Sequence, residues 1–140
     1  MNAREYNEAR KGTWVGDLGI EITSVEPGRL IAQVKVRREL LSPNGFLHAA
    51  TVVTLADSLC GSGTMDNLPE GARGYTTIEL KANLIGTARE GHIECEATLA
   101  HGGRTTQVWD ARVIAKESGK TIALFRCTQL ILYPEPSRQA

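Results

Sequence analysis

The chain has 140 residues, of which 41% are hydrophobic and 23% are charged. These proportions are typical of one soluble globular domain that buries a substantial core. Lys and Arg number 16, as do Asp and Glu, so the formal net charge is 0. That balance gives no reason to expect binding to nucleic acid or to an anionic membrane. The sequence has no apolar run near the about 18 residues that a membrane span needs.

Neither the N-terminal segment nor the cysteines suggest a secreted protein. The segment MNAREYNEARKG is charged and lacks the apolar centre of a signal peptide. Cys60, Cys95 and Cys127 are odd in number and form no CxxC pair, which favours neither a disulfide framework nor a zinc site. We therefore expect a cytoplasmic protein with free thiols and no metal or other cofactor.

The first third of the chain predicts a hairpin followed by a loop. Residues 1–11 are polar and are compatible with a short helix or an arm. Between residues 14 and 36, apolar side chains alternate with polar ones on both sides of the turn signal EPG, which predicts two paired strands. The segment RRELLSPNG then reads as a loop that ends in turn residues.

Residues 47–65 predict one long helix. The segment is rich in Ala and Leu, contains no Pro and ends near Gly61 and Gly63. Apolar and small residues spread around most of its circumference, which is typical of a buried helix. The β-branched residues 51–54 lower its intrinsic propensity. We therefore expect other elements to enclose this helix and hold it in place.

Four strand-like segments follow, at residues 75–85, 92–101, 105–117 and 121–133. Short loops join them, which favours antiparallel pairing. Two strands, one buried helix and four further strands predict an α+β domain, in which a single antiparallel sheet curls around the helix. We expect one domain over residues 1–140, with its core at about residues 12–134. The following residues are predicted to share core-facing sides of strands: Ile93, Cys95, Ala97 and Leu99, and Trp109, Ala111, Val113 and Ala115.

One acid, Asp57, falls in the middle of the predicted helix. It could be a solvated residue on an exposed stripe, or the partner of an arginine in the core. However, its neighbours Leu55, Ala56, Leu59 and Cys60 are apolar or small, and the helix has almost no other polar face for solvent to occupy. A carboxylate in such surroundings needs a partner, a pocket or both, and perturbed acids of this kind are candidates for chemistry.

The predicted helix begins near His48. By itself, a histidine at this place can be an ordinary loop or helix-terminal residue. The first backbone N–H groups of a helix have no intrahelical acceptor, and the small Ala49 and Ala50 leave them accessible. Such a terminus binds anions, including the oxyanion of a reacting carbonyl group.

The spacing of His48 and Asp57 argues against a site within one helix. They are nine residues apart, which places them about half a turn out of phase and about 13.5 Å apart along the axis. They cannot form a hydrogen-bonded pair on one helix. We therefore expect a composite site, in which Asp57 of one chain faces the helix start of another in a symmetric homo-oligomer.

Several segments together resemble hotdog-fold acyl-CoA thioesterases. The segment NGFLHAATVVTLADS resembles the G-x-x-H-G-G…L-A-D segment of the branch that contains PaaI-like and Arthrobacter-type 4-hydroxybenzoyl-CoA thioesterases. The likeness continues in LGIEITSVEPGRL, IELKANLIGTAREG, AHGGRTTQVWDARV and SGKTIALFRCTQLILYP, and spans residues 14–134. It implies a sheet wrapped around one central helix, with chains paired edge to edge as homodimers and often as homotetramers.

The resemblance also implies roles for four residues. Asp57 matches the catalytic carboxylate, and Ala49 matches the residue whose backbone N–H polarises the thioester carbonyl. His48 matches the histidine at the helix start. Thr77 matches a Ser or Thr on the following strand that helps to place the acid or the attacking water.

Other matches concern substrate binding. Asn44 and Gly45 belong to the matched segment before the histidine. Arg104 and Thr105 fall within HGGRTT, where the family contacts the nucleotide end of coenzyme A. The chain departs from the family twice. H-A-A replaces H-G-G, which narrows the site, and Ser42 stands where the family often has Asn or Gln.

The implied reaction is hydrolysis of an acyl-CoA thioester, with coenzyme A as part of the substrate rather than a cofactor. Asp57 would act as a general base on water, or as a nucleophile that forms a mixed anhydride. Two alternatives are a non-catalytic acyl-CoA binding or sensing protein and a hotdog enoyl-thioester hydratase or dehydratase. Besides Arg104, the basic residues that could meet coenzyme A phosphates, or be plain surface charges, are Arg73, Lys81 and Arg89.

Overall fold

The computed structural model describes residues 1–137. The last three residues of the expected domain, 138–140, lie outside the described residues. The helices are α1 (Ala3–Arg10), α2 (Trp14–Asp17) and α3 (Ala49–Asp66), with a 3-10 turn, η1, at Arg38–Leu40. The strands are β1 (Glu21–Glu26), β2 (Arg29–Lys35), β3 (Gly74–Leu84), β4 (His92–Gly102), β5 (Thr106–Ala115) and β6 (Thr121–Leu132). None of these helices has the length and hydropathy of a membrane-spanning segment.

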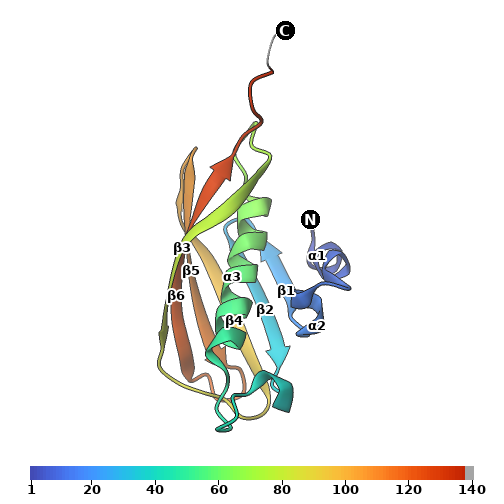
Figure 1. Ribbon diagram of the computed structural model, residues 1–140, viewed down its shortest axis with the longest axis vertical. Helices are drawn as coiled ribbons and strands as arrows, with labels where there is room; N and C mark the ends of the chain where they lie inside the picture. Colours follow the sequence, from blue (N-terminus) through green and yellow to red (C-terminus); the bar gives the residue numbers. More distant parts are fainter. Residues whose placement is uncertain (138–140) are drawn as a thin grey trace.

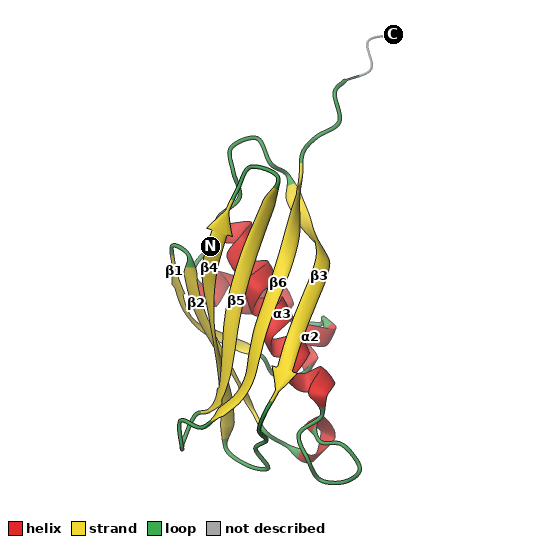
Figure 2. Ribbon diagram, turned by 90° about the vertical axis from the view of Figure 1, so that its left-hand side faces the viewer, coloured by secondary structure: helices red, strands yellow, loops and turns green. Residues whose placement is uncertain are grey.

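The six strands form one antiparallel sheet with the order β1-β2-β4-β5-β6-β3. The chain leaves β2, passes through α3 and enters β3 at the far edge, so α3 connects the two sides of the sheet while it runs roughly along the strands (Figure 1). Figure 1 shows the sheet curving around α3, and Figure 2 shows the helices behind the sheet. The predicted α+β fold, with one antiparallel sheet wrapped around a long helix, is therefore confirmed.

The core lies between α3 and the concave face of the sheet. Leu55 and Leu59 of α3 are fully buried there, as is Trp109 of β5. The Trp109 Nε1 donates to Gln107 Oε1 at 2.8 Å, and Gln107 Nε2 donates to the Asn67 carbonyl at 2.8 Å. These two hydrogen bonds provide partners for the buried polar side-chain atoms of Trp109 and Gln107. Of the alternating residues predicted to face the core, Leu99 and Ala115 are only partly buried and the others are buried.

Two glycines of α3 allow strands to approach the helix closely. A Cβ atom at Gly63 would lie 2.6 Å from Cη2 of Trp109, and one at Gly61 would collide with the hydroxyl oxygen of Tyr75. Real Cβ atoms do not approach other atoms this closely. The GSG segment is therefore a contact surface for aromatic rings rather than a phosphate-binding loop.

Residues 14–17 differ from the prediction, which placed them in the first strand. They form the short helix α2, because the side-chain oxygen of Thr13 accepts from the Gly16 N–H at 3.3 Å and caps the turn. Gly16 is required here, since a Cβ at this position would collide with the carbonyl oxygen of Arg10. The chain thus turns sharply between α1 and β1.

Helix α1 covers the outer edge of β1. Its start carries a capping box, in which Asn2 accepts from the Glu5 N–H and the Glu5 carboxylate accepts from the Asn2 N–H. The Asn7 side chain then bonds both backbone groups of Ile22: its Oδ1 accepts from the N–H at 2.8 Å and its Nδ2 donates to the carbonyl at 2.9 Å. These bonds fix α1 beside the sheet, near α3.

The enclosure of α3 differs from the prediction on one side. The sheet covers one face of the helix, but the opposite face is only partly covered by residues of α1 and α2. Several residues of this face are partly or fully exposed to solvent. They include Ala50, Thr54, Asp57, Ser58, Ser62 and Met65. This partly open stripe holds the predicted catalytic acid.

Candidate functional site

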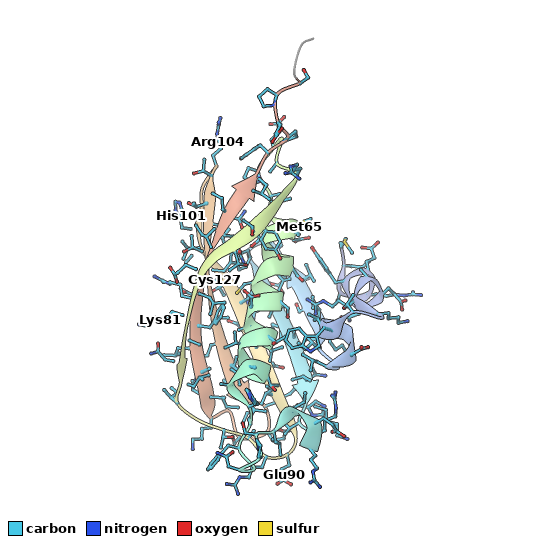
Figure 3. The ribbon with its side chains drawn as sticks, in the orientation of Figure 1. Met65, Lys81, Glu90, His101, Arg104 and Cys127 are labelled. Carbon is cyan, nitrogen blue, oxygen red and sulfur yellow. The ribbon has the colours of Figure 1, made fainter. Side chains whose placement is uncertain are left out.

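A pocket of about 370 Å³ opens beside the middle of α3. Residues from α1, the α1–α2 region, α3 and β3 form its walls. Aromatic and aliphatic side chains alternate with hydroxyl groups and two charged groups, a composition typical of a small-molecule site. The lining residues are Tyr6, Ala9, Arg10, Thr13, Val15, Asp57, Ser58, Gly61, Ser62, Met65 and Tyr75. Figure 3 labels Met65 near the C-terminal end of α3, and so marks one end of this pocket.

Asp57 is half-buried in this pocket, and its Oδ1 atom is fully buried. Neither of its oxygens takes part in a hydrogen bond or ion pair with any residue in 1–137. Burial alone raises the pKa of the Asp57 carboxyl above its ordinary value. The acid is thus not the partner of a core arginine, and one of its two oxygens is shielded from solvent.

Tyr75 of β3 faces Asp57 across the pocket. Burial raises the pKa of its hydroxyl, and the negative charge of Asp57 raises that pKa further. The ring lies against Gly61, where the absent side chain leaves room for its hydroxyl. Sequence reasoning missed Tyr75, although it lies two residues before Thr77 and therefore on the same face of the strand.

Arg10 closes the same pocket from the end of α1. Its Nη2 donates to Ser62 Oγ at 2.8 Å and to the Ser58 carbonyl at 3.4 Å. Its Nη1 is buried and has no hydrogen-bond partner in residues 1–137. Burial lowers the pKa of this guanidinium below its ordinary value. No local sequence pattern marks this residue, because its contacts come from the packing of α1 on α3.

His48 is the N-cap residue of α3, as the predicted helix start implies. Its Nδ1 accepts from the Ala50 N–H at 2.9 Å, and its carbonyl accepts from the Thr51 N–H at 3.0 Å. The Ala49 N–H has no acceptor among residues 1–137, and Ala49 is exposed. The helix start therefore offers one free backbone donor beside the imidazole.

A second pocket, of about 230 Å³, lies at this helix start. His48, Ala50 and Thr54 form one wall, and Trp14, which is 66% exposed, stands opposite. Asp57 does not line this pocket, and His48 does not line the pocket of Asp57. One chain therefore does not bring together the two residues that the sequence singled out.

Thr77 lies on β3 just before a bulge. Thr77 pairs with Gln129 and Glu79 with Thr128, so Ile78 is an extra residue in the strand. The Thr77 hydroxyl donates to Gln129 Oε1 at 2.7 Å. Thr77 does not line the pocket of Asp57 in its own chain.

Ser42, Asn44 and Gly45 form a tight turn just before α3. The Ser42 carbonyl accepts from the Gly45 N–H at 2.9 Å, and the Ser42 N–H donates to the Phe46 carbonyl at 2.7 Å. Gly45 has a φ of +83°, which favours glycine. The Asn44 side chain accepts from the Phe46 N–H at 3.2 Å, so this amide is used to fix the turn.

Arg104 and Thr105 lie in the turn between β4 and β5, at the end of the sheet labelled by Arg104 in Figure 3. The Thr105 carbonyl accepts from the Ile131 N–H at 2.9 Å, and the Arg104 carbonyl accepts from the Tyr133 hydroxyl. The Arg104 guanidinium lies 6.0 Å from the centre of the Tyr133 ring. Figure 3 shows Lys81 on the side of the sheet away from α3, so the candidate basic residues are scattered.

No three His, Cys, Asp or Glu side chains gather into a possible metal site within residues 1–137. Cys60, Cys95 and Cys127 are free and buried. Cys60 contacts Cys127 in the core, and burial together with this contact raises its pKa. The thiolate, which is the reactive form, is therefore disfavoured at Cys60.

The outer edge of β3 has no paired strand among residues 1–137. Most of its side chains are exposed, although several are large and apolar. Ile78 is 56% exposed. The other exposed apolar residues along β3 and just after it are Leu80, Leu84 and Ile85. An apolar strand edge of this kind is prone to pair with another chain.

Comparisons with known proteins agree with this architecture. A model of the thioesterase superfamily matches residues 44–122. The 1,4-dihydroxy-2-naphthoyl-CoA hydrolase of Listeria monocytogenes is 32% identical over 79% of this chain and 89% of its own length. The Escherichia coli protein of the same name is 31% identical over 90% of this chain and 91% of its own length.

A solved structure is also similar. The crystal structure of a mutant of thioesterase PA1618 from Pseudomonas aeruginosa superposes with a TM-score of 0.89 at 27% sequence identity. The match covers 94% of each chain. The region matched by the superfamily model, residues 44–122, contains His48 and the whole of α3 with Asp57. On the family match, the sequence relatives and the fold, this chain belongs to the thioesterase superfamily.

Proposed function

We propose that this chain hydrolyses an acyl-CoA thioester to a free acid and coenzyme A, at a site shared by two copies. The observation that carries the proposal is Asp57, a half-buried carboxylate that lines a pocket and is unbonded within residues 1–137. An acid left unbonded in a partly apolar pocket costs stability, which is the arrangement expected of a catalytic base.

The helix start supplies the complementary half of the reaction. In our proposal, the thioester carbonyl accepts a hydrogen bond from the Ala49 N–H, and the positive end of the α3 dipole stabilises the oxyanion. The free Ala49 N–H supports this role. His48 holds the Ala50 N–H and so fixes the first turn. Asp57 of the other copy activates water, or attacks the carbonyl itself.

Two observations support a site shared between copies. His48 and Asp57 line different pockets of one chain, so each pocket lacks half of the chemistry. The unpaired edge of β3 also carries exposed apolar residues that a second copy can cover. A two-fold dimer joined at this edge would contain two equivalent composite sites. We propose a homodimer as the minimal active form, which further pairing would extend to a tetramer.

Secondary roles follow from the same arrangement. We propose that Thr77 positions the acid or the water, and that the turn containing Ser42, Asn44 and Gly45 shapes the entrance. Arg104 and Thr105 are proposed to bind the nucleotide end of coenzyme A, where a guanidinium suits a phosphate.

The test is a panel of acyl-CoA substrates assayed for release of free thiol. It includes aryl, arylacetyl and medium-chain thioesters, together with 1,4-dihydroxy-2-naphthoyl-CoA because two relatives carry that substrate in their names. We expect hydrolysis of at least one member and a loss of kcat of about 100-fold or more in Asp57→Asn. Binding without thiol release would instead favour a sensor, and hydration of an enoyl-CoA would favour a hydratase.

A further inference from the structure

The pocket beside α3 contains a cation that its own chain does not neutralise. Arg10 forms no ion pair with any residue in 1–137, and its Nη1 is buried without a hydrogen-bond partner. A buried charge without a counter-charge is costly, and the cost is removed when an anion binds. The geometry therefore favours a ligand that brings an anionic oxygen to Arg10.

The guanidinium is held at a fixed place in the pocket. Its Nη2 is bonded to Ser62 Oγ and to the Ser58 carbonyl, so rotation of the side chain is restricted. This anchoring leaves Nη1 and the Nε–H as the donors that no residue in 1–137 uses. A lysine could not reproduce the arrangement, because an ammonium has no second nitrogen to hold the group in place while the first binds.

The distance from Asp57 suits a short acyl chain. Ser58 and Ser62, which anchor Arg10, follow Asp57 by one and five residues, so the guanidinium lies within about 7.5 Å of Asp57 along the helix axis. Apolar and aromatic side chains of Val15, Met65 and Tyr75 line the pocket that both charged groups share. An acyl group that reacts at Asp57 can therefore extend past these side chains and place its far end at Arg10.

We propose that Arg10 binds a carboxylate at the far end of the acyl group, so that the preferred substrates are CoA thioesters of dicarboxylic acids. This inference rests on the proposed hydrolysis at Asp57 and adds the chemical class of the acyl group. Arg10 is then a specificity residue: it pairs with the distal carboxylate, while the thioester carbonyl reacts elsewhere in the same pocket. A charge-assisted hydrogen bond in a partly buried site makes such a preference strong.

The test compares adipoyl-CoA with hexanoyl-CoA, which have the same chain length and differ in a terminal carboxylate or methyl group. We expect the wild-type kcat/KM to be higher for adipoyl-CoA by about tenfold or more. Arg10→Met, which keeps the length of the side chain without the charge, should reduce this ratio to about one or below, and Arg10→Lys should retain part of it. Because both rates come from the same preparation, the ratio does not depend on how much of the variant is folded.

Arg4→Met provides the matched control, since Arg4 is exposed on the same helix and does not line the pocket. Its adipoyl to hexanoyl ratio should equal that of the wild type. The inference is overturned if the wild type prefers hexanoyl-CoA, or if Arg10→Met leaves the adipoyl to hexanoyl ratio of kcat/KM unchanged. It is also overturned if Arg10→Met slows hydrolysis only of thioesters whose acyl group carries a neutral phenol. Each of these results still includes hydrolysis that requires Asp57, and so leaves the proposed function intact. Failure of the entire substrate panel would overturn the proposed function itself.

Discussion

His48 caps the central helix through its side chain: Nδ1 accepts from the Ala50 N–H at 2.9 Å. This bond assigns the imidazole a structural role that is independent of catalysis. It also directs the neighbouring Ala49 N–H outward as the free donor of the first turn. The capping residue, His48, and the proposed oxyanion donor, Ala49, are thus adjacent in the chain.

The capping role predicts how two substitutions at His48 differ. His48→Ala removes the acceptor for the Ala50 N–H and should lower the free energy of unfolding by about 1 kcal/mol. His48→Asn offers a side-chain oxygen at the same place and should stay within a few tenths of a kcal/mol of the wild type. Denaturant unfolding of both variants measures the difference. Equal stabilities would mean that the cap contributes nothing.

The burial of Asp57 predicts that removing its charge stabilises the fold. Its pKa is raised in the folded chain, so its contribution to stability is greatest at low pH and declines as pH rises through the folded pKa. Asp57→Asn should therefore have a higher Tm than the wild type at pH 7. The difference should shrink as pH falls below about 4, where the wild-type acid is protonated in both states. A lower Tm for Asp57→Asn at pH 7 would contradict this account.

The same shift predicts the acid limb of the pH–rate profile. A general base or nucleophile works only when it is ionised, so kcat/KM should rise with pH through the pKa of Asp57. That midpoint should lie above the ordinary value of 3.8, because burial raises it. The measurement is initial rates of thiol release across buffers of constant ionic strength. A midpoint at or below the ordinary value would show a carboxylate in full contact with water.

Close packing at Gly63 predicts a large effect from one methyl group. Gly63→Ala places a Cβ against the Trp109 ring and should lower the free energy of unfolding by about 1–3 kcal/mol. Gly74→Ala is the matched control, because nothing lies within 4 Å of a Cβ at that position. Thermal unfolding compares the two. Similar Tm values for both variants would mean that the helix and sheet can separate at low cost.

The proposed shared site predicts complementation between two inactive variants. Ala49→Pro removes the proposed oxyanion N–H at the first helical position, where proline fits the helix. Asp57→Asn removes the acid. In a mixture refolded in equal amounts, half of the dimers combine both variants, and each of these has one intact site. We expect about a quarter of the wild-type activity.

Each variant refolded alone is the control for this experiment and should be nearly inactive. If the mixture is no more active than the two variants alone, both groups act within one chain. Size-exclusion chromatography with light scattering measures whether subunits have paired, and native mass spectrometry shows whether the two variants share a dimer. A failure to mix is thus recognised separately from a failure to complement.

The regular elements could be predicted because their signals are local. Alternating residues such as Ile93 and Cys95 mark a strand with one buried face, and the Ala-rich segment around Leu55 marks the helix. The helix α2 could not be predicted, since the apolar residues around Trp14 also fit a strand. Its formation depends on the Thr13 cap and on the close approach of Gly16 to α1.

The site was predictable only in part, for a similar reason. Asp57 and His48 stand out in the sequence because they interrupt an apolar segment. Arg10 does not stand out among the other charges near the N-terminus, and its contact with Ser62 joins residues 52 positions apart. Such contacts arise from the packing of elements, which periodicity does not encode.

The bonds between Asn7 and Ile22 have a consequence for assembly. A sheet with two open edges can add strands without end and grow into fibres. Here the side-chain amide of Asn7 occupies the backbone groups of Ile22 near the start of β1, and α1 lies beside that edge. If two molecules join through β3, as we propose, the strand edges that remain are those of β1, which Asn7 and α1 cover in part. The N-terminal helix therefore acts as a terminator of polymerisation, and its loss would open a path to aggregation.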